Sequence, residues 1–137
     1  MSILEDAGLE LIQLSPELVI YRYTVNTAFT QIHGVLHGGI SGAIAEQAAS
    51  IGAAQAAPEG FIALGTSLEA HHLRPVPLGT ECEARATPES TGRLQVWRVE
   101  QRILATGELF NVSSVSLYLK RIHPRENAVK ESSYPAS

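Results

Sequence analysis

The stretch from residue 31 to residue 57 constrains the fold of this chain more than any other. It contains the glycine pair Gly38 and Gly39 and then continues through alanines and isoleucines to Pro58. This pattern predicts a glycine-rich loop followed by one helix of about 18 residues, because the glycines permit a tight entry and the proline ends the segment. Since the helix is apolar on all sides, we expect it to be buried on all sides.

Two features of the predicted helix could take part in a catalytic site. The first backbone N–H groups of a helix have no partner within it, and they lie at the positive end of its dipole. Gly38 and Gly39 would let a ligand oxygen come close to these groups, which makes an oxyanion site possible. The second feature is Glu46, the only acidic residue between Glu17 and Glu59. A carboxylate within a helix of small apolar residues needs a structural or functional reason.

Composition excludes several classes of protein. The length of 137 residues fits one domain. A net charge of −4 with no basic stripe argues against a nucleic-acid partner. The single cysteine, Cys82, excludes an intrachain disulfide and a cysteine-rich metal site, and we expect it to be a half-buried strand residue. Because the sequence shows no leader pattern and no apolar run of membrane-spanning length, we expect a cytoplasmic protein without a membrane partner.

Alternation of polar and apolar residues predicts the strands around the helix. Residues 9–14 and 17–25 form a hairpin, and four more strands follow at 61–73, 81–88, 93–104 and 109–120. In the strand 61–73, strict alternation places four residues on one face: Leu64, Thr66, Leu68 and Ala70.

The predicted elements give an α+β domain over residues 1–122, in which an antiparallel sheet wraps one central helix. Residues 1–8 are expected to form a helical turn. The polar tail from 123 to 137 contains two prolines, and we expect it to be disordered.

The motifs of this chain resemble those of the hotdog-fold acyl-CoA thioesterases. The resemblance rests on His37-Gly38-Gly39, on an acid seven residues after the second glycine, and on the order of hairpin, helix and four strands. It is most similar to the phenylacetate-pathway, 4-hydroxybenzoyl-CoA and 1,4-dihydroxy-2-naphthoyl-CoA hydrolases that use a helix glutamate. The resemblance runs from residue 9 to about residue 120 and includes further matching positions: Gln31, Ser50, His72-x-Arg74 and Gln95-Val96-Trp97.

The resemblance implies a role for each residue near the helix. Gly39 N–H would polarise the thioester carbonyl, and Glu46 would attack that carbonyl or activate water against it. The sequence leaves the nucleophilic and general-base routes open. Gln31 and His37 would orient the carbonyl and the loop. Ser50, one helical turn beyond Glu46, would orient the carboxylate or hold the water.

Helix geometry adds a constraint on this site. Glu46 lies seven residues beyond Gly39, or about 10 Å along the helix axis. One side chain does not span that gap and leave room for a carbonyl carbon, so we expect the carboxylate to come from a second subunit. A homodimer with antiparallel central helices would have two such sites. The resemblance further implies a homotetramer, formed as a dimer of dimers.

The expected substrate is an acyl-CoA with an aromatic or other ring-bearing acyl group. Coenzyme A is part of the substrate, and no cofactor or metal is expected, although His33 and His37 have a spacing that some zinc sites use. We expect four residues to bind the substrate: Gly38, His33, His72 and Arg74. His33 stands where similar enzymes often have an aromatic residue. Arg74 is the first candidate for binding the CoA phosphates, and Arg93, Arg98 and Lys120 are secondary candidates.

Other functions remain open at the level of sequence. A non-catalytic acyl-CoA-binding module is favoured if Glu46 is paired away from the pocket. A hotdog dehydratase or hydratase would need an acid–base pair over the acyl chain. A proofreading thioesterase with broad substrate use is a further alternative.

Overall fold

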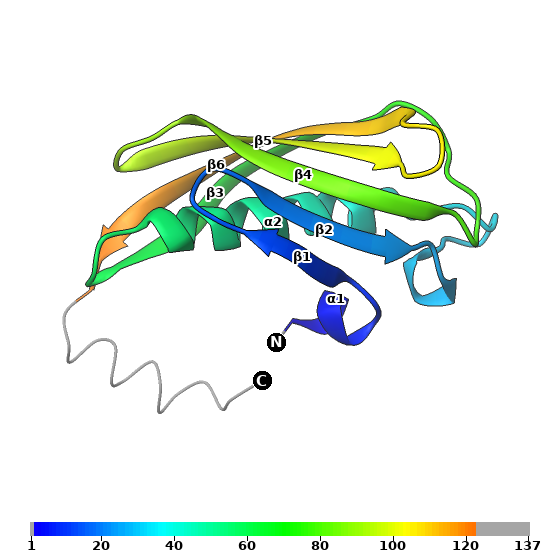
Figure 1. Cartoon of the computed structure of the whole chain (residues 1–137), viewed down its shortest axis with the longest axis horizontal. Helices are drawn as coiled ribbons and strands as arrows, with labels where there is room; N and C mark the ends of the chain where they lie inside the picture. The colour runs from blue at the N-terminus through cyan, green and yellow to red at the C-terminus, as the bar shows by residue number, and fades with distance from the viewer. Residues whose placement is uncertain (1, 123–137) are drawn as a thin grey trace.

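A six-stranded antiparallel sheet curves over one long helix, α2 (Figure 1). The computed structural model describes residues 2–122, so the prediction for the tail 123–137 lies outside the described residues. The elements are α1 (Ile3–Asp6), β1 (Glu10–Leu14), β2 (Val19–Thr24), η1 (Thr27–Phe29), α2 (Gly38–Ala56), β3 (Phe61–His72), β4 (Glu81–Ser90), β5 (Leu94–Ile103) and β6 (Leu109–Arg121). The predicted α+β architecture and all six predicted strands are confirmed.

The strand order leaves β1 and β3 as the two edges of the sheet. Neighbouring strands follow the order β1-β2-β4-β5-β6-β3. β3 pairs with β6 along its whole length, so its other side carries backbone N–H and C=O groups that have no strand partner among residues 2–122.

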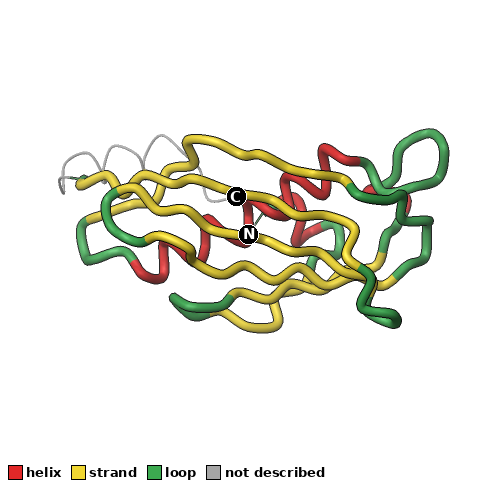
Figure 2. Tube along the Cα trace, turned by 90° about the horizontal axis from the view of Figure 1, so that it is seen from above, coloured by secondary structure: helices red, strands yellow, loops and turns green. Residues whose placement is uncertain are grey.

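The helix α2 is buried on one face only. Figure 2 shows the helix running beneath the strands, which cover it from one side. Its buried residues recur every three to four positions, as a single stripe requires: Ser41, Gly42, Ile44, Ala45, Ala48, Ala49, Gly52 and Ala53. Glu46 and Ala54 are exposed. The prediction that α2 is buried on all sides is therefore wrong for a single copy of the chain.

Small residues on α2 bring the sheet close to the helix. A Cβ atom placed on Gly52 would lie 2.4 Å from Cη2 of Trp97 on β5, so only glycine leaves room for the indole ring. Trp97 is fully buried and donates its Nε1–H to Gln95 Oε1 over 2.8 Å. Trp97 is therefore part of the core between the sheet and α2.

A β-bulge in β3 changes which residues face the helix. The register with β6 shifts between Gly65 and Ser67. Before the shift, Gly65 faces Glu46 on α2, and after it Leu68 contacts the position of Gly42. Residues 65 and 68 could not share a face in an unbroken strand, so the predicted strict alternation from Leu64 to Ala70 is wrong. A bulge of one residue has no signal in the hydrophobic pattern.

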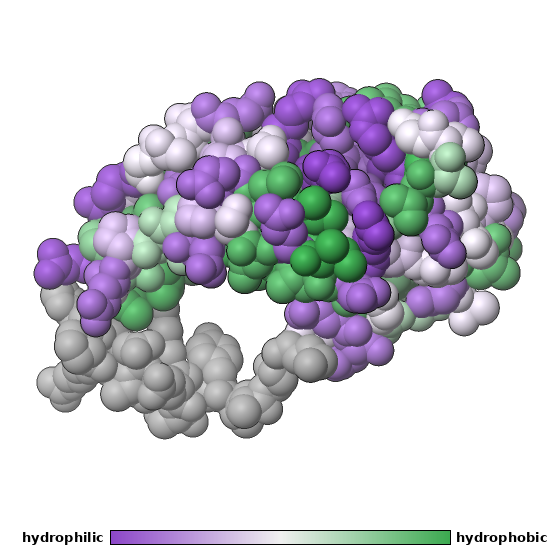
Figure 3. Space-filling view, viewed as in Figure 1, coloured by the Kyte–Doolittle hydropathy of each residue, from purple (hydrophilic) through white to green (hydrophobic). Residues whose placement is uncertain are grey.

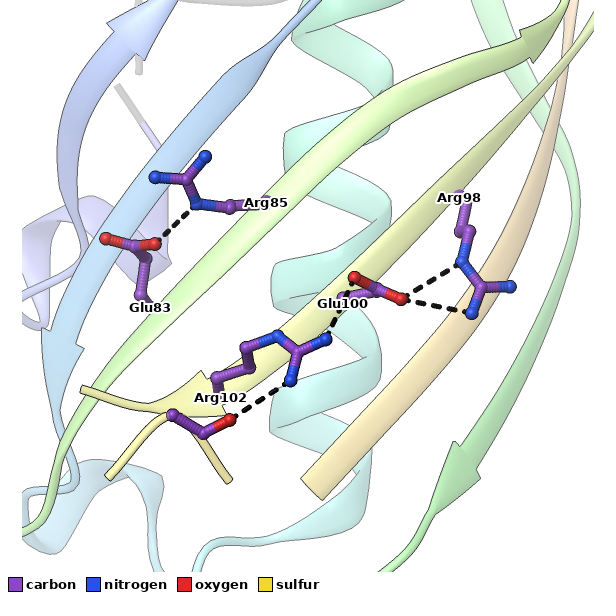
Figure 4. Close-up of polar contacts among 6 residues, drawn as sticks. Glu83, Arg85, Arg98, Glu100 and Arg102 are labelled. Carbon is purple, nitrogen blue, oxygen red and sulfur yellow. Dashed lines mark hydrogen bonds and ion pairs between the residues drawn. The ribbon is translucent and has the colours of Figure 1, made fainter. Parts of the chain in front are cut away.

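The face of the sheet away from α2 carries ion pairs (Figure 4). Glu83 pairs with Arg85 at 2.6 Å, and Glu100 pairs with Arg98 at 3.1 Å and Arg102 at 3.3 Å. Partial burial acts to raise the pKa of Glu83 and of Glu100, but the arginine hydrogen bonds outweigh it and hold each pKa below its ordinary value.

Apolar side chains also reach the surface. Figure 3 shows them gathered over the region of β1 and β2, and β1 is exposed along its whole length. Among residues 2–122, no helix has both the length and the apolar character needed to cross a membrane.

Candidate active site

Backbone hydrogen bonds fix the loop that precedes α2. Gly34 N–H donates to the carbonyl of Gln31 over 3.0 Å and closes a turn, in which Gly34 has a φ of 77°. This left-handed conformation favours glycine. At the end of the loop, His37 N–H donates to the carbonyl of Phe29 over 2.8 Å, and Phe29 is buried in the core. The start of α2 is therefore held in place relative to the sheet.

His37 is the N-cap of α2. Its Nδ1 accepts the backbone N–H of Gly39 over 2.9 Å. A neutral imidazole can accept at one nitrogen and donate at the other, so this bond assigns the ring proton of His37 to Nε2. The predicted oxyanion donor, Gly39 N–H, thus points at an imidazole nitrogen in this structure. A substrate oxygen would share or replace that partner.

Two cavities meet at the start of α2, and Gly38 lines both. The first has a volume of about 520 Å³, and three predicted residues share it with Gly38: Gln31, His33 and His37. The second has a volume of about 400 Å³, and its walls include His72 and Arg74. The structure therefore brings six of the nine predicted site residues to these two cavities, and a seventh, Gly39, lies at the same end of α2.

Gln31 and His33 belong to one local contact in the loop. The side-chain Oε1 of Gln31 accepts the backbone N–H of His33. This bond engages the amide oxygen of Gln31. The imidazole of His33 is exposed at the cavity wall.

Glu46 lies two turns along α2 from Gly39 and is exposed. Its carboxylate rests beside β3, where a Cβ atom on Gly65 would lie 3.3 Å from Glu46 Oε2. Among the ion pairs within residues 2–122, none includes Glu46. The chain itself therefore does not bring this carboxylate to the cavities at the helix start.

Ser50 follows Glu46 by one turn of α2 and is partly buried. Its position fits the predicted role beside the carboxylate. The third polar side chain in the middle of the helix, Gln47, turns elsewhere and donates to Glu5 and Tyr21.

His71 and His72 point to opposite sides of β3, as alternation predicts. His71 bonds to Glu69 on the outside at 3.0 Å. His72 turns inward, where its Nδ1 lies 3.1 Å from Asn111 Nδ2 and 3.3 Å from Ser41 Oγ. At its other end, the ring packs on Gly38, since a Cβ atom there would lie 3.1 Å from His72 Nε2.

Arg74 is paired with Glu108 at the rim of the second cavity. Both side chains are 47% exposed, and such surface pairs are worth about 0–1 kcal/mol. The pair can therefore open for a phosphate at little cost. Of the secondary candidates, Arg93 stacks on the rings of Phe61 and Tyr118, and Arg98 is paired with Glu100.

Sequence reasoning did not find the residues behind the second cavity. Ser41, Phe110 and Asn111 lie in or beside its wall, but they come from two separate parts of the chain, α2 and β6. Asn111 on an alternating strand carries a usable signal, since a polar residue at an inward position requires a partner.

Comparison with known proteins places this site in a family. The family model described as "Thioesterase superfamily" matches residues 33–110, which include the start of α2, Glu46, His72 and Arg74. The chain belongs to the thioesterase superfamily. It is an enzyme that hydrolyses thioesters, and its fold is the hotdog fold expected from the sequence.

Individual relatives agree with this assignment. A thioesterase of Haemophilus influenzae has a solved structure that superposes with a TM-score of 0.81 at 34% identity, over 88% of this chain and 84% of that chain. The 1,4-dihydroxy-2-naphthoyl-CoA hydrolase of Listeria monocytogenes is 33% identical over 73% of this chain and 81% of its own length. The 1,4-dihydroxy-2-naphthoyl-CoA thioesterase 2 of Arabidopsis thaliana is 42% identical over 64% of this chain and 55% of its own length.

Proposed function

We propose that this thioesterase hydrolyses an acyl-CoA with an aromatic or other ring-bearing acyl group, at a site shared between two subunits. The main support for the proposal is the position of Glu46. This exposed carboxylate lies two turns beyond the start of α2, away from the cavities at the helix start. The two relatives named for 1,4-dihydroxy-2-naphthoyl-CoA support a ring-bearing CoA thioester as substrate.

A second copy of the chain would supply the missing carboxylate. Gly39 and Glu46 are seven residues apart, so they lie on nearly the same side of α2 and about 10 Å apart along its axis. A twofold axis midway between them would pass near Gly42 and Ala43. It would set Glu46 of each copy opposite Gly39 of the other. The small side chains at these central positions allow two helices to approach closely.

The exposed edge of the sheet favours the same arrangement. β3 lies next to the exposed side of α2, and within the described part of the chain its outer backbone groups have no strand partner. Leu64 and Leu68 of β3 are 41% and 40% exposed. Pairing β3 with a second β3 would satisfy the backbone groups, cover these leucines and bring the two α2 helices side by side.

The chemistry then divides between the subunits. Gly39 N–H and the dipole of α2 stabilise the developing charge on the carbonyl oxygen, and one such fixed donor is worth about 10²–10³ in rate. The partner's Glu46 takes a proton from water, which is worth typically 10²–10⁴. In the alternative route it attacks the carbonyl carbon, releases the CoA thiolate and leaves a mixed anhydride that water cleaves.

The remaining predicted residues act around this centre. Ser50 holds the water or the carboxylate, and Gln31 and His37 hold the loop and the carbonyl. His33 lines the cavity for the acyl ring. The ion pair between Arg74 and Glu108 opens, and the Arg74 guanidinium then binds a CoA phosphate.

Coenzyme A is part of the substrate, and the reaction uses no further cofactor. Two dimers would join to form the tetramer that the sequence resemblance implies.

The test is free-thiol release from a panel of acyl-CoAs, with the wild type, Glu46→Gln and Glu46→Ala measured side by side. The panel contains benzoyl, 4-hydroxybenzoyl, phenylacetyl, 1,4-dihydroxy-2-naphthoyl, hexanoyl and palmitoyl thioesters. We expect a preference for a ring-bearing member and a loss of at least about 10²-fold in kcat in both variants, with unchanged oligomer mass. Near-normal turnover in either variant would refute the role of Glu46, and a preference for palmitoyl-CoA would refute the ring-bearing substrate.

A further inference from the structure

A chain of buried polar side chains crosses the core and ends at the second cavity. Tyr23 O–H donates to Gln101 Oε1 over 2.6 Å, and Gln101 Nε2 donates to the carbonyl of Ser41 over 2.8 Å. Asn111 then donates to Ser41 Oγ over 3.3 Å and to His72 Nδ1 over 3.1 Å. Gln101 and Asn111 are fully buried, so each polar atom along this path needs a partner.

Asn111 and His72 are direct cross-strand neighbours. They occupy paired positions in the β3–β6 register, and their side chains lie on the same, helix-facing side of the sheet. Ser113, two residues along β6, donates its hydroxyl to Asn111 Oδ1 over 2.7 Å. This contact sets which end of the Asn111 amide faces His72.

Hydrogen-bond satisfaction selects this orientation of the amide. In the observed arrangement, one N–H of Asn111 reaches Ser41 Oγ, the other reaches His72 Nδ1, and Ser41 donates its own hydroxyl to the carbonyl of Gly38 over 3.0 Å. If the amide were turned over, Ser41 Oγ and His72 Nδ1 would both lose the donor that Asn111 supplies, and the hydrogen bond with Ser113 would have to reverse its direction. The observed orientation gives both amide N–H groups a partner, and a buried N–H without a partner is destabilising.

An amide N–H that points at Nδ1 has a defined consequence for the imidazole. The amide nitrogen is a donor only, so His72 Nδ1 must accept and must carry no proton. The ring proton then lies on Nε2. That nitrogen is the end of the ring that packs on Gly38, in the wall of the second cavity.

We propose that Asn111 is a positioning residue that holds His72 in the Nε2–H tautomer, so that His72 donates a hydrogen bond to a carbonyl oxygen of the substrate beside Gly38. This role rests on the proposed thioester hydrolysis at the start of α2. Asn111 itself does not touch the substrate and acts through His72.

Three variants separate this role from a purely structural one. Asn111→Asp keeps the shape of the side chain, but its carboxylate can only accept a hydrogen bond, so it favours the tautomer with the proton on Nδ1. His72→Ala removes the donor. Gln101→Met is the matched control, because it disrupts the same buried chain at a residue that does not contact His72.

The first readout is the ¹⁵N NMR spectrum of the imidazoles in the free enzyme, with His72 assigned by its loss in His72→Ala. We expect a protonated Nε2 and an accepting Nδ1 in the wild type and in Gln101→Met, and the reverse in Asn111→Asp. A protonated Nδ1 in the neutral wild-type ring would overturn the proposal. The spectrum is recorded without substrate, so it tests the tautomer of His72 independently of the proposed function.

The second readout is kcat/KM with the best thioester of the panel. We expect a loss of about 10-fold in Asn111→Asp and in His72→Ala, and little further loss in the double variant, because both changes remove the same donor. A reversed tautomer with unchanged kcat/KM would overturn the role of Asn111 in the reaction. An inert wild type with the expected spectrum would refute the proposed function and leave the tautomer assignment standing.

Discussion

The carboxylate of Glu46 lies against Gly65 on the neighbouring strand, where a Cβ atom would come within 3.3 Å of Oε2. This contact fixes where the carboxylate can rest, next to the β-bulge and beside the exposed edge of β3. The absence of a side chain at position 65 therefore leaves room for this carboxylate, which in the proposed dimer would reach a second subunit from here.

A side chain at position 65 is expected to impair activity more than stability. In Gly65→Val, the added methyl groups push the carboxylate of Glu46 aside, and we expect kcat to fall about 10-fold or more while the thermal midpoint changes little, because valine suits a strand. Ser67→Val on the same strand is the matched control. Equal losses of kcat in the two variants would show that the contact with Glu46 is unimportant.

A side chain at position 52 is expected to destabilise the fold. In Gly52→Ala, the new Cβ would lie 2.4 Å from Trp97 Cη2, and the fully buried indole cannot move away. Overpacking of this kind costs about 1–3 kcal/mol, which exceeds the gain of about 1 kcal/mol from replacing glycine in a helix. Denaturant unfolding measures the difference, and combining the change with Trp97→Phe should recover part of the loss. A more stable Gly52→Ala variant would contradict the packing.

The alternating pattern sufficed to predict the strands, and the run of small apolar residues between Gly39 and Pro58 sufficed to predict the long helix. Gly38, Gly39 and Glu46 could be identified because their residue types are unusual at those places in an apolar helix. The β3 bulge could not be predicted, since one extra residue leaves no mark on the pattern. The contact between His72 and Asn111 depends on strand register, which a single sequence does not fix.

Alkaline pH is expected to destabilise the enzyme through Cys82. The side chain is fully buried rather than half-buried as the sequence suggested, and burial raises the pKa of its thiol from 9.0 to about 12, although a hydrogen bond with Tyr23 opposes the shift. In the unfolded chain the thiol loses its proton near its ordinary pKa, whereas the folded chain keeps it. The unfolded state therefore binds fewer protons between pH 9 and 12, and stability falls as pH rises through this window.

Denaturant unfolding at a series of pH values checks this expectation. In the wild type, Cys82 contributes a slope of up to about 1.4 kcal/mol per pH unit above pH 9. In Cys82→Ala we expect a shallower decline, with a remainder from Tyr23, whose buried hydroxyl also has a raised pKa. Identical slopes in the two proteins would exclude a contribution from the thiol.

The Arg74–Glu108 pair predicts opposite effects for its two members. Arg74→Ala removes a candidate phosphate ligand, so we expect the KM for acyl-CoA to rise several-fold. Glu108→Gln frees the guanidinium for the phosphate, so we expect KM to fall. Both effects should shrink at high salt, because the groups are exposed. A thioester that lacks the nucleotide part of CoA is the control substrate, and its KM should respond to neither change.

Mixing of two inactive variants tests the shared site most directly. Glu46→Ala removes the carboxylate, and Gly39→Val fills the space before the N–H donor, since even a Cβ atom there would lie 3.0 Å from His37. Each pure variant should be inactive. In a purified mixed dimer, one site carries both changes and the other carries neither, so we expect about half the activity of the wild type. A mixed dimer as inactive as its parents would show that Gly39 and Glu46 act within one chain and would contradict the account.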